Sequence, residues 1–112
     1  MSEREMNLGL FLQPVHRSEK PWAIALREDR ETVLLADRLG LWEGWIGEDF
    51  STRAEQIPSP LMFLATLIQE TSSIRFGTGV INLPFHDPVI VAAEVAQFDQ
   101  LSGGRVMFGI GP

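Results

Sequence analysis

The chain has 112 residues, of which 45% are hydrophobic and 21% charged, so its composition is that of one globular domain and excludes a disordered chain. Its formal net charge of -6 disfavours nucleic acid as a partner, because phosphate binding requires clustered Lys and Arg. The absence of cysteine excludes disulfides and thiolate metal sites, and no apolar run reaches the ~18 residues of a membrane span, so we expect a cytoplasmic protein without a membrane partner.

Apolar runs and helix-like segments alternate along the chain at a spacing of roughly 30 residues, which is typical of βαβ units. The predicted strands cover residues 6–12, 43–48, 74–80 and 105–110, and the predicted helices cover residues 22–39, 61–70 and 89–101. This order predicts one α/β unit over residues 1–112. Its parallel strands would lie in chain order, with right-handed crossovers and all three helices on one side of the sheet.

Local signals place the ends of these helices. Ser59–Pro60 and Asp87–Pro88 each combine an N-cap residue with a proline in the first turn, and Gly40 is the expected stop of the first helix. The first helix is expected to bury an apolar face that ends at Leu39. The segment 61–70 is apolar nearly all round, so we expect it to be buried.

Polar side chains gather where the predicted strands end, which is where parallel α/β folds place their sites. Glu48 and Asp49 are adjacent acids at the end of the second strand. One of them would be a general base, or would accept hydrogen bonds from the N–H groups of a heterocycle. The alternative is a solvated loop pair, or a Glu bonded to neighbouring backbone.

The histidines and the last glycines give weaker signals. A metal at His86 would lack a third ligand, and Asp87 is better used as a helix cap, so we expect no metal. His16 lies in a polar loop, and an exposed position is favoured over a ligand contact. Gly109–Gly111 follows a strand, as a dinucleotide-binding turn would, but no such motif follows the first strand, where a Rossmann fold carries it.

The pair of glycines around Thr78 at the end of the third strand gives a stronger signal. Gly77 and Gly79 would let the backbone approach a flat ligand without a side chain in between. A strand bulge or tight barrel packing would use glycine equally well.

Several motifs at consistent spacing together resemble the bacterial luciferase-like monooxygenase family, and within it the limonene monooxygenase type. They run in order from about Asn7 to Pro112. The motifs are Leu39-Gly-Leu-Trp-Glu-Gly-Trp-Ile-Gly-Glu48, Ile74-Arg-Phe-Gly-Thr-Gly-Val-Ile-Asn-Leu-Pro-Phe-His-Asp-Pro88, Val91-Ala-Ala-Glu94 and Phe98-Asp-Gln-Leu-Ser-Gly-Gly-Arg-Val-Met-Phe-Gly-Ile-Gly-Pro112.

The resemblance implies a TIM (β/α)8 barrel, of which this chain would be the N-terminal (β/α)4 portion. It implies a flavin-dependent monooxygenase that uses reduced FMN and O2 on a small organic substrate, with a separate flavin reductase as partner. By position, Thr78, Gly79 and Val80 would line the flavin ring, with a non-prolyl cis peptide at Gly79–Val80. Glu48 would be the family's acidic residue after strand two, and would serve the cofactor and the catalysis.

The chain departs from the family at Asp49, where the usual residue is a His that acts at the flavin site. Asp49 accepts hydrogen bonds and protons, but with the opposite charge. A TIM barrel has about 250 residues, so four strands represent a truncated barrel that we expect to be inactive alone. The open edge at 105–110 would pair with another chain, so we expect a homo-oligomer.

Three hypotheses follow from these observations. The first is an FMN-dependent monooxygenase. The second is an F420-dependent oxidoreductase of the same superfamily, which transfers hydride without oxygen. The third is a non-catalytic, truncated paralogue that dimerises or binds flavin passively.

Overall fold

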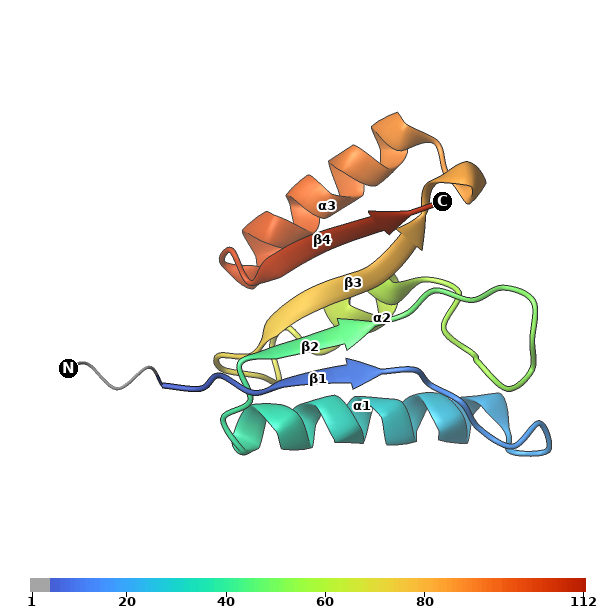
Figure 1. Ribbon diagram of the computed structural model, residues 1–112, viewed down its shortest axis with the longest axis horizontal. Coiled ribbons are helices and arrows are strands. Elements are labelled where there is room, and N and C mark those ends of the chain that lie inside the picture. The colour runs from blue at the N-terminus through green and yellow to red at the C-terminus, as the bar shows by residue number, and fades with distance from the viewer. Residues whose placement is uncertain (1–4) are drawn as a thin grey trace.

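The computed structural model describes residues 5–112, which form a four-stranded sheet flanked by helices (Figure 1). The strands lie in the order β1-β2-β3-β4, and each neighbouring pair is parallel, as the sequence predicts. In chain order the elements are β1 (Gly9–Leu12), α1 (Trp22–Arg38), β2 (Glu43–Ile46), α2 (Pro60–Ala65), β3 (Arg75–Asn82), the 3₁₀ helix η1 (Leu83–Phe85), α3 (Pro88–Ser102) and β4 (Val106–Gly111).

The parallel register brings the loops after the strands to one edge of the sheet. In Figure 1 all four arrowheads point the same way, and the β1–α1 loop, the β2–α2 loop and η1 lie at that end. Phe11 pairs with Trp45, Trp45 with Gly77, and Gly77 with Met107, so these residues form one row on the same face. The carboxyl edge therefore carries every segment in which the sequence predicts a site.

The three helices cover the other face of the sheet, and the hydrophobic core lies between them. Ile46 and Phe76 project from the sheet and are fully buried there. The Phe76 ring meets Phe98 of α3 edge to face, with centroids 5.8 Å apart, and the same core includes Val33 of α1 and Leu64 of α2. Full burial of one such side chain contributes about 1.5–3 kcal/mol. The predicted placement of all helices on one side is confirmed.

Capping residues begin and end the helices as predicted. The Ser59 hydroxyl accepts a hydrogen bond from the Met62 N–H at the start of α2, and the Asp87 carboxylate accepts one from the Val89 N–H at the start of α3. Gly40 follows α1 with a φ of 78°, a left-handed conformation that favours glycine.

The predicted first strand is too long at its start. β1 begins at Gly9 instead of residue 6, and Leu8 is exposed. Gly9 pairs with Glu43, the first residue of β2, so residues 5–8 extend beyond the end of the neighbouring strand. Among residues 5–8, the Leu8 carbonyl accepts a hydrogen bond from the Trp42 N–H.

The second helix is shorter and less buried than predicted. It ends at Ala65, and residues 66–70 continue as turns. The Thr66 hydroxyl and its own N–H both donate to the Phe63 carbonyl, which tightens the chain into an i,i+3 turn. Leu61, Phe63 and Leu64 of α2 are buried as expected. Met62 on the outer side of α2 and Leu39 just past the end of α1 are exposed, so the expected burial is wrong for these two residues.

Asp37 and Arg105 close the opposite, amino end of the sheet. The Asp37 carboxylate accepts hydrogen bonds from the N–H groups of Ser72, Ser73 and Ile74 at 2.9–3.0 Å. The Arg105 guanidinium donates to the Ile68 and Ile74 carbonyls among others and lies over the Phe76 ring. Both side chains form hydrogen bonds with backbone groups of the segment that precedes β3.

The Asp37 carboxylate predicts an acid-sensitive fold. Burial raises its pKa, but the hydrogen bonds from Ser73, Ile74 and Ser72 outweigh burial, so the pKa is lowered overall. A lowered pKa gives stability that is present above the unfolded value of about 3.9 and is lost as pH falls through the folded value.

We expect Asp37→Ala to lower the free energy of unfolding by about 1–2 kcal/mol at pH 7, because three backbone donors lose their acceptor. Urea denaturation at pH 7 and pH 3 measures this effect. The difference in the free energy of unfolding between wild type and variant should be smaller at pH 3 than at pH 7. An equal difference at both pH values would contradict the role of the Asp37 charge.

Candidate functional site

A cleft of about 640 Å³ lies at the carboxyl edge of the sheet, between the segment that follows β2 and the end of β3. It is lined by Glu48, Asp49, Phe50, Ser51, Asn82 and Phe85. Its volume is within the range of small-molecule sites, about 300–1,000 Å³. The two acids predicted from the sequence therefore face the same cleft as the last residue of β3.

The Glu48 carboxylate anchors the segment after β3. Its side chain is fully buried. Oε1 accepts hydrogen bonds at 3.0 Å from the backbone N–H and the side-chain amide of Asn82, and Oε2 lies 2.7 Å from Nε2 of His86. One carboxylate thus joins the chain on both sides of η1. Glu48 is a hydrogen-bonded anchor, which excludes the solvated loop pair considered from the sequence.

Asp49 has the opposite environment. Its Oδ1 accepts a hydrogen bond from the Ser51 N–H at 2.9 Å, an Asx turn that shapes the loop. This hydrogen bond is the main reason that the pKa of Asp49 is lowered, so the carboxylate is ionised at neutral pH. The Glu48 carboxylate is buried and already accepts three hydrogen bonds, whereas Asp49 lies at the cleft surface as an anion.

The other predicted site residues lie in β3, beside the cleft and not among the residues that line it. Thr78 is buried, and its hydroxyl donates to the Gly109 carbonyl and accepts from the Gly109 N–H, each at 2.9 Å, so it joins β3 to β4. The Gly79–Val80 peptide bond is cis, as the resemblance implies. The register between β3 and β4 shifts just after Thr78.

Gly79 opens toward the uncovered face of the sheet. A Cβ atom there would lie 3.0 Å from the Phe11 ring and 3.6 Å from the Trp45 ring. Phe11 is 61% exposed. Two aromatic rings therefore lie against the glycine backbone, and the polar ends of β2 and β3 lie next to it.

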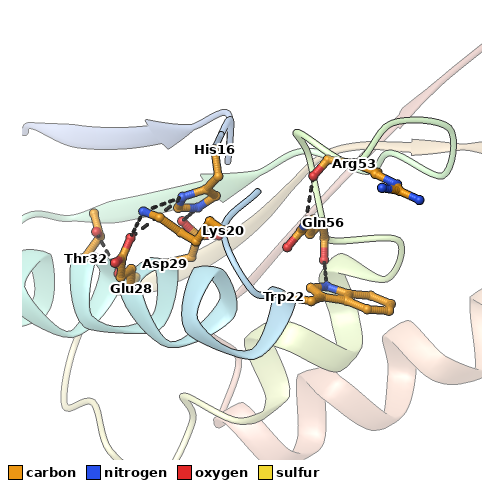
Figure 2. Close-up of polar contacts among 8 residues, drawn as sticks. All are labelled: His16, Lys20, Trp22, Glu28, Asp29, Thr32, Arg53 and Gln56. Atoms are coloured by element: carbon orange, nitrogen blue, oxygen red, sulfur yellow. Dashed lines mark hydrogen bonds and ion pairs between the residues drawn. The ribbon is translucent and has the colours of Figure 1, made fainter. Parts of the chain in front are cut away.

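His16 is not exposed, contrary to the sequence-based expectation. Its side chain is 10% exposed, and Nε2 lies 2.8 Å from Oδ1 of Asp29, which α1 presents from below (Figure 2). Asp29 is itself buried, and burial raises its pKa despite the His16 hydrogen bond. Lys20 lies on the outer side, 2.6 Å from the Glu28 carboxylate. The sequence places His16 and Asp29 on different elements, and only the packing of the loop on α1 joins them.

The β1–α1 and β2–α2 loops are tied together near this cluster. The His16 N–H donates to the Ala54 carbonyl. The Trp22 indole N–H donates to the Gln56 carbonyl at 2.9 Å (Figure 2). The loop that supports the cleft from the β2 side is thereby held to the loop after β1.

We expect His16→Ala to destabilise the protein by about 3 kcal/mol, because it leaves the buried Asp29 carboxylate without its partner. Asp29 Oδ2 already has no partner within residues 5–112. Lys20→Met, which removes the exposed half of the same cluster, is the matched control and should change stability little. Thermal unfolding of the two variants measures the difference, and equal midpoints would contradict the role of the buried pair.

Within the described part of the chain, no group of three or more His, Asp or Glu side chains is arranged to hold a metal ion. Between residues 5 and 112 no helix is both long and apolar enough to cross a membrane.

Comparison with known proteins places this chain in a family. Residues 6–112 match the model of the luciferase-like monooxygenase family. The chain is 43% identical over 107 residues to limonene 1,2-monooxygenase from Rhodococcus erythropolis, covering 96% of this chain and 28% of that protein. It is 32% identical over 106 residues to the oxygenase component of the flavin-dependent trigonelline monooxygenase from Acinetobacter baylyi, covering 94% and 29%.

Solved structures agree with the sequence relatives. The oxygenating constituent of 3,6-diketocamphane monooxygenase from Pseudomonas putida, in complex with FMN, superimposes with a TM-score of 0.91 and 27% identity, covering 96% of this chain and 29% of that chain. The coenzyme F420-dependent tetrahydromethanopterin reductase from Methanopyrus kandleri matches with a TM-score of 0.74 and 26% identity, covering 96% and 27%.

The chain therefore spans less than a third of the length of each of these proteins. Its four parallel strands in chain order correspond to part of the barrel that the family forms, as the motifs predict. The family match extends over nearly every described residue. The chain belongs to the luciferase-like monooxygenase family.

Proposed function

We propose that the protein to which this chain contributes is an FMN-dependent monooxygenase, which uses reduced FMN and O2 to oxidise a small organic substrate. The observation that carries the proposal is the glycine backbone at Gly79, which lies against the aromatic rings of Phe11 and Trp45 and next to the polar carboxyl ends of β2 and β3. The match to a monooxygenase constituent in complex with FMN supports it.

The residues fit the chemical character of a flavin. Its ring system is flat and largely apolar and has polar edges, so it suits a surface of apolar and aromatic groups bordered by hydrogen-bonding groups. Gly79 and Val80 would lie against the ring, with Thr78 fixing the strand behind them. Reduced FMN, when bound, supplies the electrons that activate O2. The chain's own residues then have to position the ring and keep water from it.

The two acids take different roles in this proposal. Glu48 is buried and already accepts three hydrogen bonds, so it holds the segment after β3 in place beside the cofactor. Asp49 is ionised and lines the cleft, so it is the acid whose carboxylate would accept a hydrogen bond from a bound molecule.

The name of one relative bears on the partner that we propose for this protein. The trigonelline relative is named an oxygenase component, which supports a separate reductase as the source of reduced FMN. A second candidate function is an F420-dependent oxidoreductase, which would transfer hydride without O2. It is favoured by the likeness to the F420-dependent reductase, whose TM-score is lower than that of the FMN complex.

Anaerobic titration of the natural, full-length protein with reduced FMN and with reduced F420 tests the choice of cofactor. We expect saturable binding of reduced FMN, at least tenfold tighter than that of reduced F420. Tighter binding of F420 would favour the second function, and binding of neither would contradict both.

Gly79→Val is expected to weaken the binding of reduced FMN by at least tenfold, because its branched side chain would occupy the surface proposed for the ring. The new Cβ would also lie 3.0 Å from the Phe11 ring. Phe11 is largely exposed and is free to turn aside, so the sheet should remain folded.

Gly44→Ala is the control, since its Cβ would meet only the end of the Ile74 side chain at 3.4 Å, on the helix-covered face. Circular dichroism checks the fold of both variants. If Gly79→Val folds and binds reduced FMN as tightly as wild type does, Gly79 is not part of the flavin site.

A further inference from the structure

Two phenylalanines form an aromatic wall at the cleft, here defined as Phe50 and Phe85. Phe50 follows Asp49 in the β2–α2 loop, and Phe85 is the last residue of η1. Their ring centroids are 5.2 Å apart, with an angle of 77° between the ring planes, an edge-to-face arrangement. They nevertheless remain 51% and 69% exposed and line the cleft beside Glu48.

The polar groups around the aromatic wall are largely committed to each other. The Glu48 oxygens accept from Asn82 and His86, and Oδ1 of Asp49 accepts from Ser51. Except at Asp49, whose carboxylate lines the cleft, a ligand that depended on hydrogen bonds would have to compete with these contacts. The faces of Phe50 and Phe85 are the surfaces that offer contact area without such competition.

The Glu48 anchor also fixes where the wall lies. Asn82 precedes η1 and His86 follows it, and the same carboxylate holds both. Phe85 is adjacent to His86, so the hydrogen bond between Glu48 and His86 sets the position at which Phe85 meets Phe50. The His86 ring is itself 6.2 Å from the Phe50 ring.

We propose that Phe50 and Phe85 form the substrate-binding wall of the cleft, that they select a small, uncharged, hydrocarbon-like substrate, and that His86 is the positioning residue of Phe85. This inference deepens the proposed function, on which it rests, by naming the class of substrate. Single exposed aromatic side chains are common on protein surfaces, but here two segments bring their rings together over one cleft.

The experiment uses the natural, full-length protein saturated with FMN and two ring probes of similar size, cyclohexene and the hydroxylated cyclohexane-1,2-diol. Calorimetric titration measures the dissociation constant of each. We expect wild type to bind cyclohexene at least tenfold more tightly than the diol. Phe50→Ala and Phe85→Ala should each weaken cyclohexene binding by about tenfold.

Val89→Ala is the matched control, because Val89 is an exposed apolar side chain just beyond η1 that does not line the cleft. It should bind cyclohexene like wild type. FMN affinity is measured separately for every variant. Failure of wild type to bind FMN would contradict the proposed function. Normal FMN binding together with unchanged cyclohexene binding in both Phe variants would overturn only the role of Phe50 and Phe85 in substrate binding. Equal affinity of wild type for the two probes, or no binding of either, would overturn the substrate class.

A double-mutant cycle tests the positioning role of His86. His86→Ala should weaken cyclohexene binding nearly as much as Phe85→Ala, and the double variant should be little worse than either single variant. His86→Gln, which keeps a donor toward Glu48, should restore most of the affinity. Additive losses in the double variant would contradict the idea that His86 acts through Phe85.

Discussion

Gly109→Ala is expected to separate β3 from β4 and to lower the free energy of unfolding by more than about 3 kcal/mol. The new Cβ would lie 2.2 Å from the carbonyl oxygen of Thr78, which is backbone and cannot rotate away. The same place holds the two hydrogen bonds between the Thr78 hydroxyl and Gly109. The clash therefore falls on the contacts that join the two strands.

Gly44→Ala provides the comparison within the same sheet, since its Cβ makes only an ordinary contact with Ile74. Urea denaturation of the two variants measures the effect. If both alanine variants are as stable as wild type, the predicted clash between the new Cβ at Gly109 and the Thr78 carbonyl oxygen is contradicted. An expected further result is that Gly109→Ala loses flavin binding, because Gly79 lies one residue from Thr78.

Glu48→Ala is expected to lower kcat/KM by about 100-fold, which is the scale of effect that a displacement of about 1 Å in a site can have. The variant leaves the Asn82 N–H and His86 without their acceptor, so the segment after β3 loses its anchor. Stability should also fall, by about 1–3 kcal/mol.

Glu48→Gln distinguishes an anchor from a general base. A Gln side chain still accepts a hydrogen bond from Asn82 but does not accept a proton at neutral pH. We expect this variant to keep kcat/KM within about tenfold of wild type and to keep its stability. A Glu48→Gln variant as inactive as Glu48→Ala, with wild-type stability, would mean that Glu48 transfers a proton in the reaction.

The order and direction of the strands were predictable from the sequence because the βαβ spacing leaves few topologies. The predicted ends of elements were wrong where a contact with another part of the fold determines where the element begins or ends. The start of β1 depends on where β2 begins, and the end of α2 depends on a Thr66 hydroxyl that takes a backbone carbonyl. Neither event leaves a periodic pattern in the sequence.

The candidate site was predictable in part. The rule that sites form at the carboxyl ends of parallel strands located Glu48 and Asp49 correctly at one cleft. It also covered the segment with His86, but nothing in the spacing of 38 residues indicated that His86 would pair with Glu48. His16 was assigned to the surface because its partner Asp29 lies on a helix that packs against the loop only in the folded chain.

In the proposed function, the site supports the reaction of O2 with an organic substrate at the expense of reduced FMN. In such a reaction one oxygen atom enters the product and the other leaves as water, while reduced FMN is oxidised. The direct measurement is a single turnover of the natural, full-length protein with chemically reduced FMN, ¹⁸O-labelled O2 and cyclohexene, followed by mass spectrometry of the product. We expect one labelled oxygen atom per product molecule, and none of this product when FMN is replaced by F420. Absence of label in the product, together with substrate reduction by F420 without O2, would contradict the proposed function.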